Sequence, residues 1–274
     1  MKRTKWTIVV LVIGCFLTGC AEMNQATRAS SSPVMDRIAA RGELRVGISG
    51  DMPPMNLLTK DDKIIGMDAD VAAMVAEAMG ARLNLQRIEF NGLLPALESG
   101  RIDMIVSNMT MTPDRNLKAA FVGPYFNSGK AFLTKRSSIA QARGLPDVNS
   151  PQYTFVALKD STSEAVIRKG APQAKLVAAG TQNEAIQMVV DGRADAMIAD
   201  FPICAVAVLR KPEAGLVSVA APITYEPIGI AVPKGDPHLL NWLGNFLHSL
   251  EKAGYMNELR QKWFAQPTWL PQMK

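Results

Sequence analysis

Two segments of the 274-residue chain share a pattern and end in polar side chains that could hold a small molecule. The segment at 97–107 passes from an apolar helical stretch through Gly-Arg-Ile-Asp into a short apolar run, and the segment at 189–200 does so through Gly-Arg-Ala-Asp. Glycine suits the left-handed position after a helix, and a short apolar run is typical of a parallel strand covered on both faces. The polar residues that follow these runs are Ser107, Asn108 and Thr110 in the first segment and Asp200 in the second.

The repeat predicts where a binding site would lie. Open parallel sheets bind ligands at the carboxyl ends of their strands. Two similar α/β lobes that face one another would therefore form a cleft with polar groups on both sides. The alternative is that Gly-Arg-x-Asp is a common helix-to-strand turn that recurs here by chance.

Strand-like and helix-like patterns alternate along the rest of the chain, which favours an α/β fold. Strands are expected near 43–48, 82–88, 104–106, 130–134, 154–158 and 228–232. Asp68 is predicted to cap a helix whose apolar residues recur at helical spacing. Ser161 with Glu164, and Thr181 with Glu184, have the spacing of capping boxes.

The N-terminus has the pattern of a bacterial lipoprotein signal. Lys2, Arg3 and Lys5 precede an apolar segment at 7–17 that is short for a membrane span. Leu-Thr-Gly-Cys then ends at Cys20 and looks like a lipobox, so residues 1–19 are expected to be removed and Cys20 to be lipidated. Residues 20–33 have the composition of a flexible tether. An ordinary signal peptide that contains a cysteine is the alternative.

Charge and cysteine content narrow the functional classes. The chain carries 30 basic and 25 acidic residues, and loss of the three basic residues of the signal leaves 27 against 25, a net charge of +2. No basic run suggests a nucleic-acid partner. Of three cysteines, Cys15 would be removed and Cys20 modified, so Cys204 has no partner for an internal disulfide. No metal-ligand cluster or phosphate-binding glycine loop is recognisable, so we expect no metal and no cofactor.

Several motifs in a fixed order resemble the bacterial extracellular solute-binding proteins of family 3, which serve amino-acid ABC transporters. They include Gly-Met-Asp-Ala-Asp at 66–70, Thr-Pro-Asp-Arg at 112–115, the second Gly-Arg-x-Asp segment, and Gly-Tyr…Trp-Phe at 254–264. The resemblance implies a type II periplasmic-binding-protein fold with two α/β lobes joined by a two-strand hinge. It places one lobe at 34–126 and 228–274 and the other at 127–227, with crossings near 126–131 and 224–228.

The resemblance also implies a role for three residues. Arg115 matches an arginine that grips an α-carboxylate, a task that suits a planar two-pronged donor. Asp200 matches the acceptor for an α-ammonium group, and Thr162 matches a threonine at a helix N-terminus that favours an anion. On the alternative view, Arg115 is a surface residue and Asp200 caps the helix that begins near Pro202.

Further ligand contacts are expected, by the same resemblance, at Ser107, Asn108, Thr110, Ser161, Phe90 and Met52. The polar residues of this set could instead satisfy a strand end or turn, and Phe90 could belong to the core. Met52 stands where an aromatic residue is common, so the choice of ligand side chain cannot be transferred from the family. Asp160 also departs from the family pattern; its carboxylate would either favour a cationic ligand or point to water.

These features lead to the expectation of a monomeric, lipid-anchored receptor in the periplasm or at the cell surface. It would bind an amino acid or related zwitterion by lobe closure and deliver it to a membrane ABC permease, without chemistry. One alternative is a dehydratase of the cyclohexadienyl or arogenate type on the same scaffold, although no proton donor stands out. Another is a sensory subunit that presents its bound ligand to a membrane protein.

Overall fold

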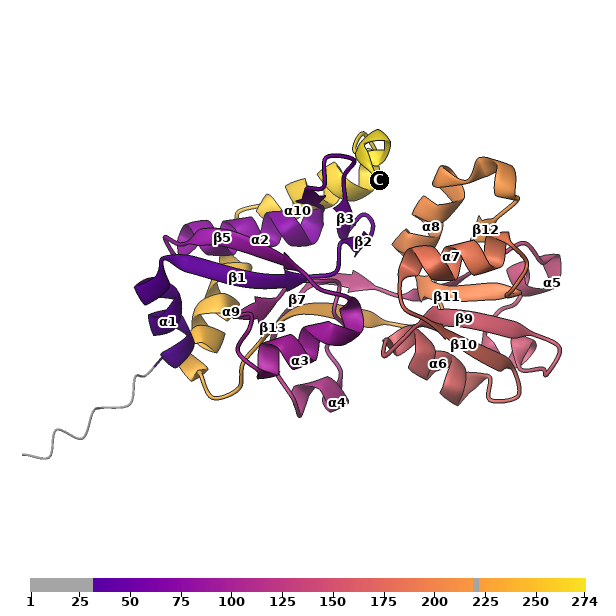
Figure 1. The fold of residues 1–274 in the computed structure, drawn as a ribbon, viewed down its shortest axis with the longest axis horizontal. Coiled ribbons are helices and arrows are strands. Elements are labelled where there is room, and N and C mark those ends of the chain that lie inside the picture. The colour runs from indigo at the N-terminus through magenta and orange to yellow at the C-terminus, as the bar shows by residue number, and fades with distance from the viewer. Residues whose placement is uncertain (1–31, 219–221) are drawn as a thin grey trace, which may run out of the picture. The chain divides into compact units, whose positions relative to one another are not determined.

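The computed structural model describes residues 32–218 and 222–274. The strands form two five-stranded sheets and a small three-stranded sheet (Figure 1). The first sheet has the order β5 (Arg82–Arg87), β1 (Glu43–Ile48), β6 (Met104–Ile105), β13 (Glu226–Val232), β7 (Ala120–Ser128). The second has the order β10 (Lys175–Ala179), β9 (Thr154–Leu158), β11 (Ala196–Asp200), β8 (Lys130–Thr134), β12 (Val217–Ser218). The small sheet contains β2 (Asp51–Met52), β3 (Asn56–Leu58) and β4 (Ile64–Ile65).

Helices cover both faces of each large sheet, and we call each sheet with its helices a lobe. In the first lobe, α2 lies on one face of the sheet and α3 on the other, and α7 and α6 have the same relation in the second lobe (Figure 1). The helices of the first lobe are α1 (Pro33–Arg41), α2 (Met67–Ala78), α3 (Leu93–Glu98), α4 (Pro113–Asn116), α9 (Pro237–Lys252) and α10 (Tyr255–Arg260). Those of the second lobe are α5 (Ser137–Ala140), α6 (Thr162–Gly170), α7 (Gln182–Val190) and α8 (Phe201–Arg210).

The two lobes have the same strand arrangement, which confirms the predicted α/β fold class. In each sheet three parallel strands are followed by an antiparallel one: β5, β1 and β6 precede β13, and β10, β9 and β11 precede β8. Each lobe buries its own apolar residues, such as Val46 and Val71 in the first and Phe132 and Phe155 in the second. Among the described residues, none of the helices is long and apolar enough to cross a membrane.

The two Gly-Arg-x-Asp segments have the same local structure. Gly100 and Gly192 adopt φ values of 72° and 73°, the left-handed conformation that glycine tolerates best. Asp103 accepts a hydrogen bond from a backbone N–H of β1 at 2.9 Å, and Asp195 accepts one from β9 at 2.7 Å. In both lobes the aspartate thus ties the third parallel strand to the central one, so the sequence repeat corresponds to a structural repeat.

The chain passes between the sheets at two adjoining places. β7 ends at Ser128 and β8 begins at Lys130, while β13 begins at Glu226, which pairs with Ser128 in the antiparallel ladder. The backbone N–H of Lys130 donates to Oγ1 of Thr224 at 3.0 Å. The two crossing segments are therefore hydrogen-bonded to each other.

Candidate functional site

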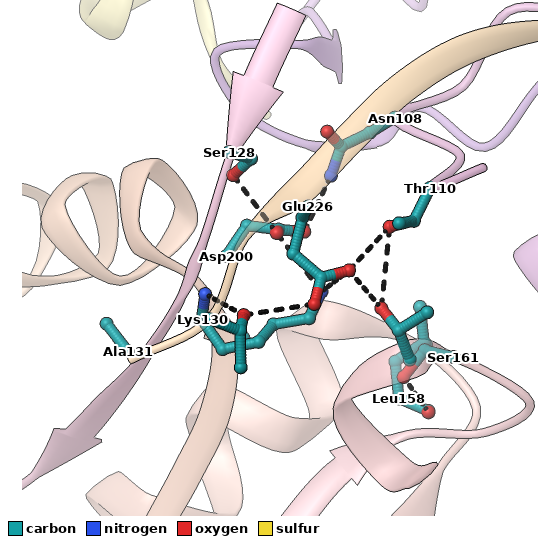
Figure 2. A network of polar contacts seen from close by, with 12 residues as sticks. Asn108, Thr110, Ser128, Lys130, Ala131, Leu158, Ser161, Asp200 and Glu226 are labelled. Atoms are coloured by element: carbon teal, nitrogen blue, oxygen red, sulfur yellow. Dashed lines mark hydrogen bonds and ion pairs between the residues drawn. The ribbon is translucent and has the colours of Figure 1, made fainter. Parts of the chain in front are cut away.

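The carboxyl ends of β6 and β11 meet, as the repeat predicted. Asn108 follows β6 with φ of 48°, a left-handed conformation that asparagine adopts more readily than most residues. Its Nδ2 donates to Oδ2 of Asp200 at the end of β11 at 2.8 Å (Figure 2). Asp200 occupies the N-cap position of α8 but makes no side-chain capping bond, so the capping alternative is wrong. Asp200 is 6% exposed as a residue, and its carboxylate is directed at groups of the site instead.

A lysine that the sequence analysis missed is bonded to this aspartate. Nζ of Lys130 lies 3.1 Å from Oδ1 of Asp200 and 3.6 Å from Oε2 of Glu226 (Figure 2). Oγ of Ser128 donates to the same Oδ1 at 3.1 Å. Lys130 is only 2% exposed, so one buried ammonium group is shared by two buried carboxylates.

Glu226, the second missed residue, accepts hydrogen bonds from three threonines. Thr110 and Thr162 donate to its Oε2 at 2.8 and 2.9 Å, and Thr224 donates to Oε1 at 3.0 Å. Burial opposes the charged form, but Lys130 and the three hydroxyl groups outweigh it and hold the pKa of Glu226 below its ordinary value. Glu226 is therefore ionised at neutral pH.

Arg115 is buried, and among the described residues it has no carboxylate partner. Its Nη1 donates to the carbonyl oxygen of Thr110 at 2.9 Å and its Nη2 to that of Asp160 at 3.3 Å. The guanidinium carbon lies 5.3 Å from the centre of the Phe90 ring, which is within the range of a cation–π contact. Within residues 32–218 and 222–274, no acidic side chain forms an ion pair with it. Burial lowers the pKa of Arg115 to about 10, against the opposing effect of Glu226 and Asp200.

A buried acid behind the site supports Asn108. Asp68 accepts hydrogen bonds from Tyr125 at 2.6 Å, from Nδ2 of Asn56 at 2.7 Å and from the backbone N–H of Asn108. Complete burial raises its pKa to about 7, and these three hydrogen bonds limit the rise. The prediction that Asp68 caps α2 is wrong, because Gly66 holds the N-cap position and the Asp68 side chain is turned into the lobe.

The remaining predicted residues divide into two groups. Met52 is buried with its Sδ 3.7 Å from Nδ2 of Asn108, so it lies in the same cluster as Asp200. Ser107 and Ser161 instead form hydrogen bonds with the backbone. Ser107 Oγ accepts from the N–H of Ser49, and Ser161 Oγ donates to the carbonyl oxygen of Leu158 at 2.6 Å. Cys20 lies outside the described residues.

Asp160 faces the site with its backbone and the solvent with its side chain. Its side chain is exposed, while its backbone, at φ of 58°, directs the carbonyl oxygen to Arg115. The carboxylate therefore takes no part in the buried charges. Across the described part of the chain, no group of three or more His, Cys, Asp or Glu side chains is arranged to hold a metal ion.

The polar groups can bind a small molecule with charges of both signs. Arg115 has five N–H donors, and two of them are used. A carboxylate has about four acceptor positions. Hydrogen bonds occupy three of them at Asp200 and three at Glu226. The site thus retains donors at Arg115 and one acceptor position on each carboxylate.

Comparison with known proteins places the chain in a family. A model of the "Bacterial extracellular solute-binding proteins, family 3" matches residues 44–266. The L-arginine-binding protein of Pseudomonas aeruginosa is 29% identical over 240 residues, with 83% of this chain and 90% of that protein covered. Cyclohexadienyl dehydratase of the same organism is 26% identical over 229 residues, with 84% and 85% covered. A solved chain from Wolinella succinogenes in complex with lysine is 36% identical, with a TM-score of 0.80, 84% of this chain covered and 99% of that one.

Proposed function

Because the chain belongs to the bacterial extracellular solute-binding proteins of family 3, we propose that it is a receptor for an α-amino acid. The ligand is held between the two lobes and passed to a membrane permease of the ABC class. The type II periplasmic-binding-protein fold supplies two lobes whose polar strand ends face each other.

The observation that carries this proposal is the buried guanidinium group of Arg115. A buried charge without a partner of opposite sign is costly, and the cost is removed when an anion binds. Two backbone carbonyl oxygens and the face of Phe90 fix the guanidinium plane while three N–H donors remain. A bidentate carboxylate matches that geometry. Thr162, at the first turn of α6, is joined to the same cluster through Glu226.

The opposite charge of the amino acid is received by Asp200 and Glu226. Lys130 supplies one positive charge to two carboxylates, so one negative charge of that pair is left for the ligand's ammonium group. The ammonium completes the acceptor position that remains on each carboxylate. Arg115 and Asp200 stand in different lobes, so a zwitterion that binds both holds the lobes together.

We propose binding without a chemical step, in preference to the dehydratase alternative. A dehydration needs a proton donor at the reacting group, and Glu226 is held in its charged form by Lys130 and three hydroxyl groups. The raised pKa of Asp68 would let it carry a proton, but its carboxyl group is fully buried and bonded to Tyr125 and Asn56. His238 and His248 are exposed. Formation of product from prephenate or arogenate by the purified protein would contradict this part of the proposal.

The site of action follows from the N-terminal sequence and the extracellular character of the family. We propose that the chain is exported, cleaved before Cys20 and anchored by lipid at that residue. The test is fractionation of cells that express Cys20→Ser: the variant should leave the membrane fraction, and continued membrane association would contradict the lipid anchor.

Calorimetry on an arginine variant tests the receptor function. Arg115→Ala should weaken α-amino-acid binding by about 2–5 kcal/mol, since the ligand carboxylate would then be buried without its partner. Arg101→Ala is the matched control because Arg101 is exposed, and its affinity should equal that of the wild type. Unchanged affinity in Arg115→Ala would remove the guanidinium from the site.

A further inference from the structure

We propose that the ligand's side chain is itself cationic, and that Asp51, Asn108 and Gln182 form the subsite that receives it. This inference rests on the proposed function and specifies the class of α-amino acid. It is carried by three acceptor atoms and by the balance of charges in the site.

The three acceptor atoms are shielded from solvent. Oδ1 of Asp51, Oδ1 of Asn108 and Oε1 of Gln182 have no hydrogen-bond partner in the described ranges 32–218 and 222–274. Asn108 and Gln182 are 4% and 3% exposed. A buried acceptor without a donor is unfavourable, and native proteins rarely leave several together. All three atoms are acceptors, so a ligand group that reaches them must carry N–H donors, as an ammonium or guanidinium group does.

Hydrogen bonds connect these residues to one another and to the site. Oδ2 of Asp51 accepts from the backbone N–H of Gln182 at 3.0 Å, so the first lobe meets the second there. Met52, the next residue, contacts Asn108, whose Nδ2 donates to Asp200. The subsite thus adjoins the ammonium-binding end of the site, whereas Arg115 is bonded to Thr110.

The charges of the site favour a cation over a neutral side chain. Two positive groups, Arg115 and Lys130, stand with three negative ones, Asp51, Asp200 and Glu226. A zwitterion with a neutral side chain leaves one negative charge in excess, and a second positive charge on the ligand removes it. A diamine without a carboxylate would leave the guanidinium group unpaired.

The cationic side chain of Arg87 lies in the neighbourhood and does not alter this balance. A Cβ on Gly50 would lie 3.6 Å from Nε of Arg87, so that side chain passes close to the chain before Asp51. Arg87 is exposed and forms no ion pair with Asp51. Water therefore screens its charge.

The experiment compares charged amino acids with neutral analogues of the same shape. Binding of L-arginine, L-citrulline, L-lysine and L-norleucine is measured by calorimetry on the wild type and on Asp51→Asn. Asparagine retains an oxygen that can accept from the N–H of Gln182, so the contact between lobes survives. Asp62→Asn is the matched control. Asp62 lies on the loop between β3 and β4, its side chain is 69% exposed, and it forms an ion pair with Lys274.

We expect the wild type to prefer arginine to citrulline, and lysine to norleucine. Asp51→Asn should weaken binding of the cationic ligands on the order of 30-fold, with little change for the neutral ones, while Asp62→Asn changes neither. Equal affinity for charged and neutral analogues, or full discrimination in Asp51→Asn, would overturn the cationic subsite but leave amino-acid binding standing. Putrescine bound as tightly as lysine would also overturn it. A wild type that binds no α-amino acid would overturn both proposals.

Discussion

Replacement of Lys130 by methionine would test whether the buried ammonium group maintains the site. At an effective dielectric constant of about 20, attraction over 3.1 Å to Asp200 and 3.6 Å to Glu226 amounts to about 5 kcal/mol for each pair. The desolvation of the lysine offsets much of that gain, but its removal leaves two buried carboxylates without a counter-ion. Loss of one partner of a buried pair costs about 3–5 kcal/mol, which is our expected loss in the free energy of unfolding.

The loss should depend on pH in a defined direction. Without Lys130, the burial of Glu226 is no longer offset by a nearby ammonium group, so the folded-state pKa of Glu226 rises above that in the wild type. The folded variant then binds more protons than the folded wild type, so the stability that it has lost relative to the wild type grows as pH rises. The deficit relative to the wild type should be larger at pH 7.5 than at pH 5.

The measurement is urea unfolding of Lys130→Met at both pH values, with Lys135→Met as the control. Lys135 directly follows β8, the strand that begins at Lys130, but it is exposed. Its replacement should therefore change the free energy of unfolding by no more than about 0.5 kcal/mol. A second substitution, Glu226→Gln, should restore part of the stability because one unpaired charge is removed. Equal stability of Lys130→Met and the wild type at both pH values would refute the reasoning.

Two further substitutions test the packing at the start of α2, next to the site. Burial raises the pKa of Asp68 from 3.8 to about 7, so the stability that its protonated form contributes is complete below pH 3.8 and lost as pH rises to about 7. Relative to Asp68→Asn, which does not titrate, the wild type should lose up to about 4 kcal/mol between pH 4 and pH 7.5 in urea titrations; a constant difference would contradict the raised pKa. Gly66→Ala should lower the melting temperature sharply, because its φ is 133° and a Cβ would lie 2.3 Å from the carbonyl oxygen of Met55. Gly244→Ala, where the nearest contact is 4.0 Å away inside α9, should be neutral or stabilising, and equal effects of the two would refute the steric argument.

The residues at the strand ends could be found from sequence because local rules govern them. The glycine after each helix and the apolar run after each aspartate fix where a parallel strand begins and ends. Asn108 and Asp200 follow such runs, and they are hydrogen-bonded to each other. The roles of Arg115 and Thr162 came only from resemblance, since a single arginine in a short helix carries no local signal of burial.

Lys130 and Glu226 were missed because they stand on crossing segments that follow no strand-end rule. One signal was available: each charged residue begins a strand that is otherwise almost entirely apolar, and the two have opposite signs. The error at Asp68 has a different origin. An acid in the first turn of a helix stabilises it locally, but Tyr125 and Asn56 come from distant parts of the fold and bind the side chain instead.

The ion pair of Lys130 and Glu226, on the two crossing segments, affects the order in which the ligand meets the charged groups of the site. Glu226 pairs with Ser128 in the ladder between β7 and β13, and the backbone N–H of Lys130 donates to Thr224, so these hydrogen bonds hold the two charged residues together where the chain crosses between the lobes. Arg115 and Asp200 stand in different lobes, and in the lobe closure that we propose they approach each other as the lobes close. On that proposal, an arriving ligand meets the preassembled ion pair at the crossing segments before the contacts from both lobes are complete.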